Sequence, residues 1–124
     1  MIKGVGTDIV EIERIDALWN KQGMRFAERL LSSTELQHFS NQIRPERFLA
    51  KRWAAKEAIS KALGTGIAQG VGFLDMTISH SSLGQPLISL TGGALARADF
   101  LAISEWHLSI SDEKHYAVAF VVAS

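Results

Sequence analysis

The sequence predicts a single α+β domain, residues 1–124, in which a long central helix packs against a largely antiparallel sheet. Strand-like segments stand at both ends of the chain and a clearly delimited helix lies in its middle, an order typical of this fold class. No Pro/Gly/Ser-rich linker divides the 124 residues. Their hydrophobic content of 47% is sufficient for one core.

The central helix is the best-defined element and extends from Pro45 to Gly64. Proline suits the first position of a helix and glycine the position just past its end. Before this helix we expect a strand over 2–7 and helices over 9–22, 24–31 and 32–41. The last of these begins at a capping box formed by Ser32 and Glu35. After the central helix we expect a glycine-rich loop over 64–72, a hairpin over 74–90, a helix over 93–103 and a closing hairpin over 106–122.

The charged side chains of the central helix do not collect on one solvated face. Arg52 and Lys56 fall between apolar neighbours, while Glu57 and Lys61 lie one turn apart beside Trp53. An unpaired buried charge costs several kcal/mol, so each of these groups needs a partner, a ligand or an exposed cleft. Glu57 and Lys61 by themselves fit an ordinary i,i+4 ion pair as well as a ligand site.

Charge and composition exclude several classes of protein. Lys and Arg number 13, as do Asp and Glu, which argues against a general nucleic-acid binder. The absence of cysteine excludes disulfides and thiolate metal sites. No apolar segment is long enough to span a membrane and no secretory leader is recognisable. We therefore expect a cytoplasmic protein that binds neither nucleic acid nor membranes.

The first strand carries an unusual pattern, Gly4-Val5-Gly6-Thr7-Asp8. Two glycines allow another element to approach the backbone closely, and the aspartate stands where the strand ends. A carboxylate in that position can cap the next helix, or it can serve a functional site.

Three segments together carry a resemblance to a known family. They are Gly-Val-Gly-Thr-Asp-Ile-Val-Glu-Ile-Glu-Arg (4–14), the Ala50 to Gly64 segment with its core Trp-Ala-Ala-Lys-Glu-Ala-x-x-Lys-Ala, and His-Leu-Ser-Ile-Ser-Asp-Glu-Lys-His-Tyr-Ala (107–117). In this order, and at this chain length, they resemble the holo-acyl-carrier-protein synthases, the short bacterial-type 4′-phosphopantetheinyl transferases. Three linked motifs are far more specific than any one of them.

The resemblance implies an activity. A serine of apo acyl carrier protein would attack the β-phosphorus of coenzyme A in a Mg²⁺-dependent reaction. The products would be holo acyl carrier protein and adenosine 3′,5′-bisphosphate, in support of fatty acid biosynthesis. A metal-activated water, or a carboxylate such as Glu57 acting through water, would accept the serine proton.

Asp8 and Glu57 are the expected metal ligands and catalytic residues, because carboxylate oxygens suit Mg²⁺, which completes its shell with water and substrate phosphate. Lys61, one turn from Glu57, is the third expected catalytic residue and would contact the pyrophosphate of coenzyme A. Arg52, Lys56, Gly64 and His107 are further candidates for the nucleotide end of coenzyme A. Gly64 belongs to a glycine-rich loop that also fits a flexible surface connection.

The resemblance also implies partners. Arg14, Arg25 and Arg29 are interleaved with apolar residues on the first helices, a pattern that fits either a solvated face or a docking face for an acidic partner. The family favours docking of the acyl carrier protein there. It also implies a homotrimer with active sites between subunits, to which Phe120 and residues such as Trp106 and Val122 could contribute, although core packing explains these side chains equally well.

Two positions depart from the family pattern. Gln85 stands where a lysine is common, and Asp112 stands where some members have a histidine. Two other classes of function remain open on the residues alone: a non-catalytic module that binds coenzyme A or an acidic protein, and a metal-dependent phosphoryl or nucleotidyl transferase with another substrate.

Overall fold

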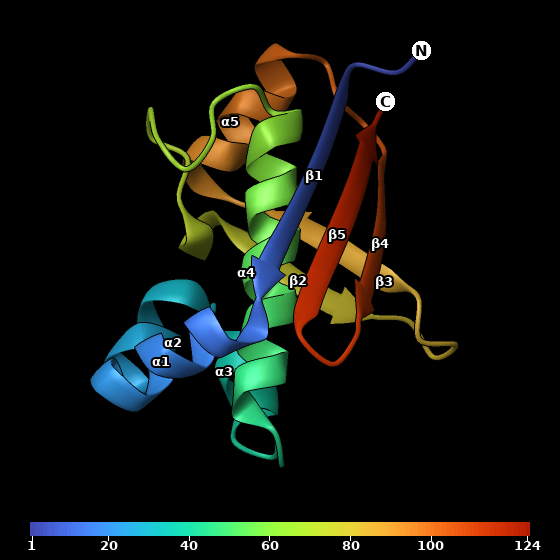
Figure 1. Ribbon diagram of the computed structural model, residues 1–124. Coiled ribbons are helices and arrows are strands. Elements are labelled where there is room, and N and C mark those ends of the chain that lie inside the picture. The colour runs from blue at the N-terminus through green and yellow to red at the C-terminus, as the bar shows by residue number, and fades with distance from the viewer.

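The computed structural model describes all residues, 1–124, and confirms the predicted α+β class. A long central helix, α4 (Pro45–Ala62), packs against a three-stranded antiparallel sheet with the order β1-β5-β4 (Figure 1). The sheet strands are β1 (Gly4–Glu11), β4 (Trp106–Asp112) and β5 (Tyr116–Ala123). The remaining elements are α1 (Ile12–Gln22), α2 (Met24–Leu30), α3 (Ser33–Phe39), η1 (Phe73–Asp75), β2 (Met76–His80), β3 (Pro86–Leu90) and α5 (Gly92–Phe100).

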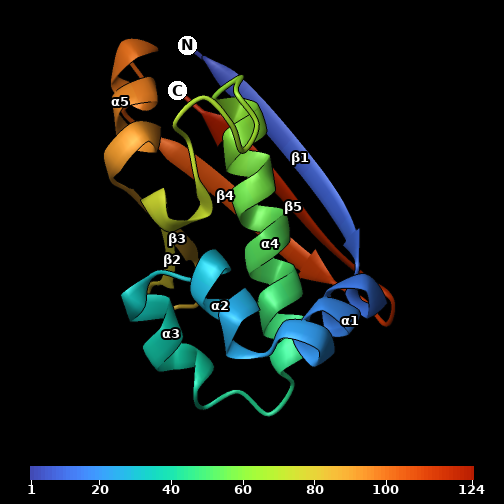
Figure 2. The same ribbon diagram turned by 90° about the vertical axis from the view of Figure 1, so that its left-hand side faces the viewer.

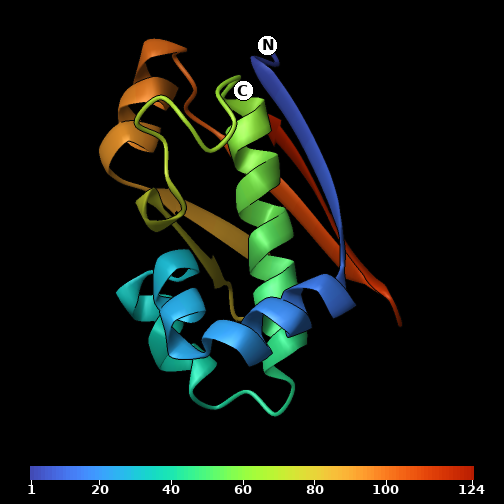
Figure 3. The same cartoon turned by 60° about the vertical axis from the view of Figure 1, so that its left-hand side comes forward.

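The elements around α4 divide between its two ends. Figure 2 shows α1, α2 and α3 at the N-terminal end of α4, and α5 beside its C-terminal end. At that second end Arg97 of α5 donates a hydrogen bond to the carbonyl of Leu63 (3.0 Å). The two chain ends also lie there (Figure 3), where the amide of Lys3 donates to the carbonyl of Ala123. The two-stranded antiparallel sheet of β2 and β3 lies on the side of α4 away from β1.

The boundaries of α4 follow the sequence signals. Pro45 stands in the first turn, and Gly64 follows the last turn with a φ of 79°, a conformation that favours glycine. The predicted capping box at the start of α3 is present, with the amide of Ser32 donating to Glu35 (2.9 Å). No helix in the structure is both long and apolar enough to cross a membrane.

The first strand is longer than predicted. The sequence indicated a strand over 2–7 and a helix from residue 9, whereas β1 continues to Glu11 and α1 begins at Ile12. The reason is the pairing with β5, because Asp8 lies opposite Ala119 and Ile9 opposite Val118 in an unbroken antiparallel register. The apolar residue at position 9, which fitted a helical period, instead points out of the sheet and is 64% exposed.

The two glycines of β1 allow close contact with α4, as their pattern predicted. A methyl group on Gly6 would overlap with the carbonyl oxygen of Ala58, and one on Gly4 with that of Ala62. Alanines continue this contact, since Ala58 is fully buried on the helix and Ala119 fully buried on the neighbouring strand. The strand therefore lies almost against the helix backbone, which sets where the next inward-facing residue, Asp8, stands.

The other face of the sheet is apolar and exposed. Val5, Ile9, Val118 and Phe120 alternate with the buried residues of β1 and β5 and are all more than one-third exposed. Trp106, in contrast, lies opposite the buried Ala123 and packs against the core. An apolar face of this kind, shared by two strands, is typical of a surface that another protein covers.

We predict that Gly6→Ala lowers the free energy of unfolding by about 1–3 kcal/mol, because the added methyl group forces β1 away from the backbone of α4. Urea unfolding followed by circular dichroism would measure the loss. Gly72→Ala is the matched control, since its backbone is extended (φ −130°) and no atom lies within 4 Å of the added carbon. It should change the stability by no more than about 0.5 kcal/mol. Equal effects of the two substitutions would contradict the contact described above.

Candidate functional site

Asp8, Glu57 and Lys61 lie together where β1 crosses α4. Lys61 Nζ is 3.1 Å from Asp8 Oδ1 and donates a second hydrogen bond to the carbonyl of Thr7 (2.9 Å). The simple i,i+4 ion pair of Glu57 with Lys61 is therefore not formed; the lysine reaches across to the strand. Its side chain remains half exposed, while that of Asp8 is 15% exposed.

The two carboxylates form an acidic pair with spare acceptor capacity. Partial burial raises the pKa of Glu57, and the charge of Asp8 raises it further, while Lys61 and Arg14 act in the opposite direction. Asp8 Oδ2 is buried without any hydrogen-bond partner. A cation between the two side chains would relieve both the repulsion and the missing contact.

The composition of this pair fits magnesium. No group of three or more His, Cys, Asp or Glu side chains in the chain is arranged to hold a metal ion, so a metal here would have only these two carboxylates as protein ligands. Mg²⁺ is commonly held by one or two carboxylates, with water and substrate phosphate completing the shell. Two carboxylates of this kind match the number of protein ligands that Mg²⁺ commonly takes beside a phosphorylated substrate.

Arg14 joins this site from α1. Its guanidinium lies 5.7 Å from the centre of the Trp53 ring, within the range of a cation–π contact, and its charge is felt by Glu57. Arg25 and Arg29 lie on α2 with exposed side chains, and Arg29 is hydrogen-bonded to Gln22. Arg14 and Arg29 thus both lie near Trp53, Arg25 follows one helical turn away on α2, and Arg14 alone acts on the carboxylate pair.

An apolar pocket opens beside these arginines. It has a volume of about 250 Å³ and is lined by Phe26, Arg29, Leu30, Trp53 and Phe73. The rings of Trp53 and Phe73 pack with their centres 5.0 Å apart. Cationic side chains thus lie next to an apolar pocket, the combination that the interleaved sequence pattern indicated.

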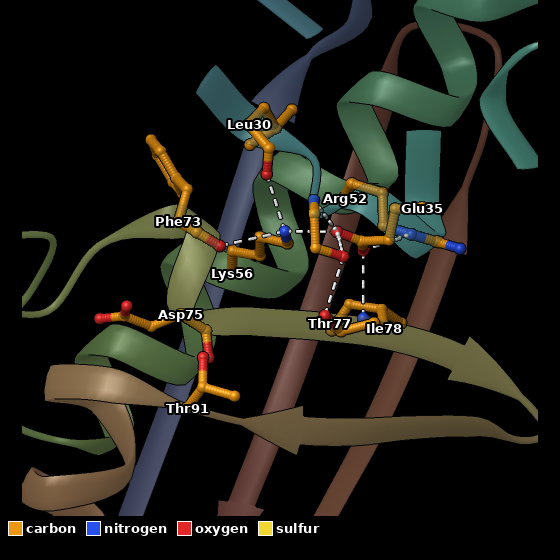
Figure 4. A network of polar contacts seen from close by, with 10 residues as sticks. Leu30, Glu35, Arg52, Lys56, Phe73, Asp75, Thr77, Ile78 and Thr91 are labelled. Atoms are coloured by element: carbon orange, nitrogen blue, oxygen red, sulfur yellow. Dashed lines mark hydrogen bonds and ion pairs between the residues drawn. The ribbon is translucent and has the colours of Figure 1, made fainter. Parts of the chain in front are cut away.

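Arg52 and Lys56 point to the other side of α4, into a buried ion cluster (Figure 4). Lys56 Nζ donates to Glu35 Oε1 (2.6 Å), and Arg52 Nε lies 3.1 Å from Glu35 Oε2 in an ion pair without hydrogen-bond geometry. Burial lowers the pKa of Arg52 and of Lys56, and the negative charge of Glu35 opposes the change in both. Glu35 is the partner that the charges of the central helix required.

This geometry changes what Lys56 can do. Its ammonium is fully buried, and it donates to the carbonyls of Leu30 (2.7 Å) and Phe73 (3.1 Å) as well as to Glu35. All three N–H groups are used, so the predicted contact between Lys56 and a nucleotide phosphate has no free donor in this structure.

Arg52 remains close to a second, larger cavity. This cavity of about 510 Å³ lies between the first half of α4, the β2–β3 hairpin and the end of β4. Its basic lining residues are His38, Lys51, Arg52 and His80. Burial lowers the pKa of His80, and the charges of Arg52, Lys51 and His38 lower it further. The cavity is thus a polar, cationic hollow.

The two departures from the family pattern lie at the rim of this cavity. Asp112, one of its lining residues, accepts a hydrogen bond from Arg47 (3.0 Å) and lies 4.0 Å from Lys51. Gln85 lies in the hairpin turn between Gly84 and Pro86, which also line the cavity. Asp112 is therefore engaged in holding the β4–β5 turn to α4.

His107 and Gly64 do not join the carboxylate pair within one chain. His107 lies opposite Val122, whereas Asp8 lies opposite Ala119, three residues away on the same strand. Because side chains alternate along a strand, His107 and Asp8 stand on opposite faces of the sheet. Gly64 lies at the end of α4 and lines neither cavity.

Sequence reasoning did not assign a role to Glu35 or Arg47. Glu35 was recognised only as part of a capping box, yet it is 1% exposed and is the shared partner of two basic side chains. Arg47 donates to Asp112 and to the carbonyls of Glu113 and Lys114. The sequence did contain a signal for Glu35, namely a capping glutamate followed by basic residues without partners on a buried helix. It contained no signal for Arg47.

Comparison with known proteins agrees with this arrangement. Residues 4–121 match the sequence profile of the 4′-phosphopantetheinyl transferase superfamily. The holo-[acyl-carrier-protein] synthase of Hydrogenovibrio crunogenus is 61% identical over 123 residues, which cover 99% of this chain and 97% of that protein.

Two solved structures extend the comparison to the fold. The holo-[acyl-carrier-protein] synthase of Neisseria meningitidis matches with a TM-score of 0.92 and 46% identity, over 100% of this chain and 99% of that one. The synthase of Helicobacter pylori, solved in complex with coenzyme A, matches with a TM-score of 0.85 and 38% identity, over 97% and 99% of the two chains. The chain therefore belongs to the 4′-phosphopantetheinyl transferase superfamily, and within it to the holo-acyl-carrier-protein synthases.

Proposed function

We propose that this protein transfers 4′-phosphopantetheine from coenzyme A to a serine of apo acyl carrier protein in a Mg²⁺-dependent reaction that supports fatty acid biosynthesis in the cytoplasm. The products are holo acyl carrier protein and adenosine 3′,5′-bisphosphate. The observation that carries the proposal is the pair Asp8 and Glu57, with an unpartnered buried oxygen and Lys61 beside it. Membership of the family, which includes a coenzyme A complex, supplies the substrate class.

Asp8 and Glu57 would hold the metal ion, and Asp8 Oδ2 is the buried oxygen that lacks a partner. A bound Mg²⁺ would supply positive charge that offsets the charge of the diphosphate during transfer. Lys61 stays close to Asp8 and, because its side chain is half exposed, can turn one N–H toward the pyrophosphate. A metal-activated water, or Glu57 acting through a water molecule, would take up the serine proton.

The carrier protein docks on α1 and α2. Arg14, Arg25 and Arg29 supply the positive charge that attracts an acidic partner, and the pocket around Trp53 and Phe73 receives one of its apolar side chains. The cation–π contact of Arg14 with Trp53 links both parts of this surface. The docked serine thereby stands next to the carboxylate pair, to which Arg14 also contributes its charge.

The nucleotide end of coenzyme A occupies the larger cavity, where Lys51 and Arg52 face its phosphates. That cavity and the carboxylate pair lie on different sides of α4 in one chain. In an assembly, a coenzyme A molecule lying between two copies would contact the cavity of one copy and the carboxylate pair of the other. His107 stands on the sheet face opposite Asp8, so in such an assembly it would meet the carboxylate pair of a neighbouring copy.

The active form is therefore proposed to be a homotrimer with sites between subunits. The exposed apolar face of β1 and β5 gives each copy a surface to bury against the next. Phe120, 49% exposed, lies near its centre. Trp106, packed against the core, contributes to the interface only indirectly.

The direct test is mass spectrometry of apo acyl carrier protein incubated with the protein, coenzyme A and Mg²⁺. We predict a gain of about 340 Da, the mass of one phosphopantetheine group, that is lost on addition of EDTA. Asp8→Asn and Glu57→Gln should each abolish the gain, because each removes a charged metal ligand. Full transfer by both variants would refute the assignment. Binding of coenzyme A without any transfer by the wild type would favour the non-catalytic alternative.

The raised pKa of Glu57 also predicts that the stability of the protein depends on pH. Its pKa is raised in the folded state, so the folded protein binds more protons than the unfolded chain at pH values just above the ordinary glutamate pKa. The free energy of unfolding therefore falls as pH rises through the raised pKa, and Glu57 destabilises the metal-free protein at neutral pH. Glu57→Gln should raise the melting temperature in EDTA at pH 7, and the gain should shrink near pH 4. The exposed Glu28→Gln is the control; an equal gain there would contradict the prediction.

The trimer has its own test. We predict that the active wild type sediments as a trimer and that Phe120→Asp dissociates it, because a carboxylate on the apolar face cannot be buried without a partner. Transfer activity should fall with the trimer. Leu95→Asp, at a similarly exposed position on α5, should leave sedimentation unchanged. An active monomeric wild type would overturn the proposal.

A further inference from the structure

Lys56 is hydrogen-bonded to two of the elements that form the apolar pocket, although it does not line the pocket itself. The pocket is formed by side chains from three elements, α2, α4 and η1. The ammonium of Lys56 donates to the carbonyl of Leu30 at the end of α2 (2.7 Å) and to that of Phe73 in η1 (3.1 Å), while its own backbone belongs to α4 (Figure 4). Leu30 and Phe73 are themselves lining residues. One side chain therefore fixes the distance between the elements that enclose the pocket.

The anchor of this contact is Glu35. Its Oε1 accepts from Lys56 and from the amide of Ser32, and its Oε2 accepts from the amide of Ile78 (3.0 Å). A buried carboxylate held by backbone donors on both oxygens cannot rotate without losing a hydrogen bond. Lys56 thus has a counter-charge in a fixed place, and its three N–H groups are directed at three fixed oxygens.

Phe73, whose carbonyl is held by Lys56, also packs against the residues of the docking surface. The ring of Phe73 contacts the ring of Trp53, which also packs with Phe26 (6.1 Å between centres) and carries Arg14 at 5.7 Å. A shift of η1 would therefore alter the shape of the pocket and the place of Arg14 together. On its other side Glu35 pairs with Arg52 and accepts from the amide of Ile78, and both residues line the cationic cavity. Because these two contacts do not involve Lys56, we expect them to persist when Lys56 is replaced.

We propose that Lys56 is a positioning residue for the carrier protein: it sets the width of the apolar pocket by holding α2 and η1 to α4. This role rests on the proposed docking of an acidic partner on α1 and α2. It replaces the contact with coenzyme A phosphates that the sequence pattern suggested for Lys56. The lysine touches neither substrate and acts through Leu30 and Phe73.

The experiment is steady-state kinetics with Lys56→Met, an apolar replacement of similar length. The KM for apo acyl carrier protein should rise by at least about fivefold, the loss expected when a well-packed contact is disturbed, while the KM for coenzyme A stays within about twofold. Lys51→Met is the reciprocal control, because Lys51 lines the cavity assigned to coenzyme A; it should raise the KM for coenzyme A and spare that for the carrier.

Removing a buried charge can also prevent folding, so Lys56→Arg is the second variant. The guanidinium keeps the charge opposite Glu35, but its planar donors do not match three oxygens arranged around an ammonium. It should raise the KM for the carrier in the same direction. Circular dichroism checks the fold of each variant, and amide hydrogen exchange should quicken around Leu30 and Phe73.

The outcomes separate the possible roles. A rise in the KM for coenzyme A alone would mean that Lys56 supports the coenzyme A cavity, through Glu35 and Arg52, and would overturn the proposal. A loss of melting temperature or kcat with both KM values unchanged would make the role merely structural and would also overturn it. If the wild type itself transfers nothing, the proposed function fails separately. The Kd of each variant for apo acyl carrier protein, measured by calorimetry without coenzyme A, then decides the role of Lys56.

Discussion

The contact between β1 and α4 is the constraint on which the site depends. Gly4 and Gly6 leave no room for a side chain against the carbonyls of Ala62 and Ala58, so the strand and the helix meet backbone to backbone. At this spacing Lys61 crosses from the helix to Asp8 and to the carbonyl of Thr7. A larger residue on either glycine would separate the two carboxylates as well as weaken the core. The close contact at Gly4 and Gly6 therefore affects both the stability of the fold and the position of Asp8 and Lys61.

The second constraint is electrostatic. Three ionised side chains, Glu35, Arg52 and Lys56, are withdrawn from water on the side of α4 that faces away from Asp8. Removing one member of such a cluster commonly costs about 3–5 kcal/mol, whereas a well-packed apolar replacement of the whole set can be neutral. The cluster is thus better understood as a device for specificity: it holds α2, α3 and η1 at defined places around one helix, with hydrogen bonds that an apolar core would not supply.

Local signals in the sequence were sufficient for most of the fold. Pro45 and Gly64 delimit α4, the pair Ser32 and Glu35 begins α3, and the order of strands and helices gives the α+β class. The end of β1 could not be predicted, because pairing with β5 continues the strand through residues whose apolar spacing also fits a helix. Pairing between the two ends of a chain is a tertiary effect, invisible to a local pattern.

The same distinction applies to the site. Asp8, Glu57, Lys61 and Arg14 were identified from residue types and from the family resemblance, and the structure brings these four together. Arg52 and Lys56 were known only to need partners; that Glu35 supplies them follows from tertiary packing. His107 illustrates the limit most clearly, because its position on the far face of the sheet depends on a register that no single motif contains.

The pairing of β1 with β5 also has a consequence for biosynthesis. The first strand of the chain has only one neighbour in the sheet, and that neighbour is the last strand, with Gly4 opposite Ala123. On the ribosome, α4 emerges long before residues 116–123, and until they follow, the edge of β1 has no strand to pair with. Contacts of such sequence separation slow folding, and they leave the apolar faces of α4 and β1 open for longer. The strand that carries Asp8 thus becomes fully paired only after residues 116–123 have been synthesised.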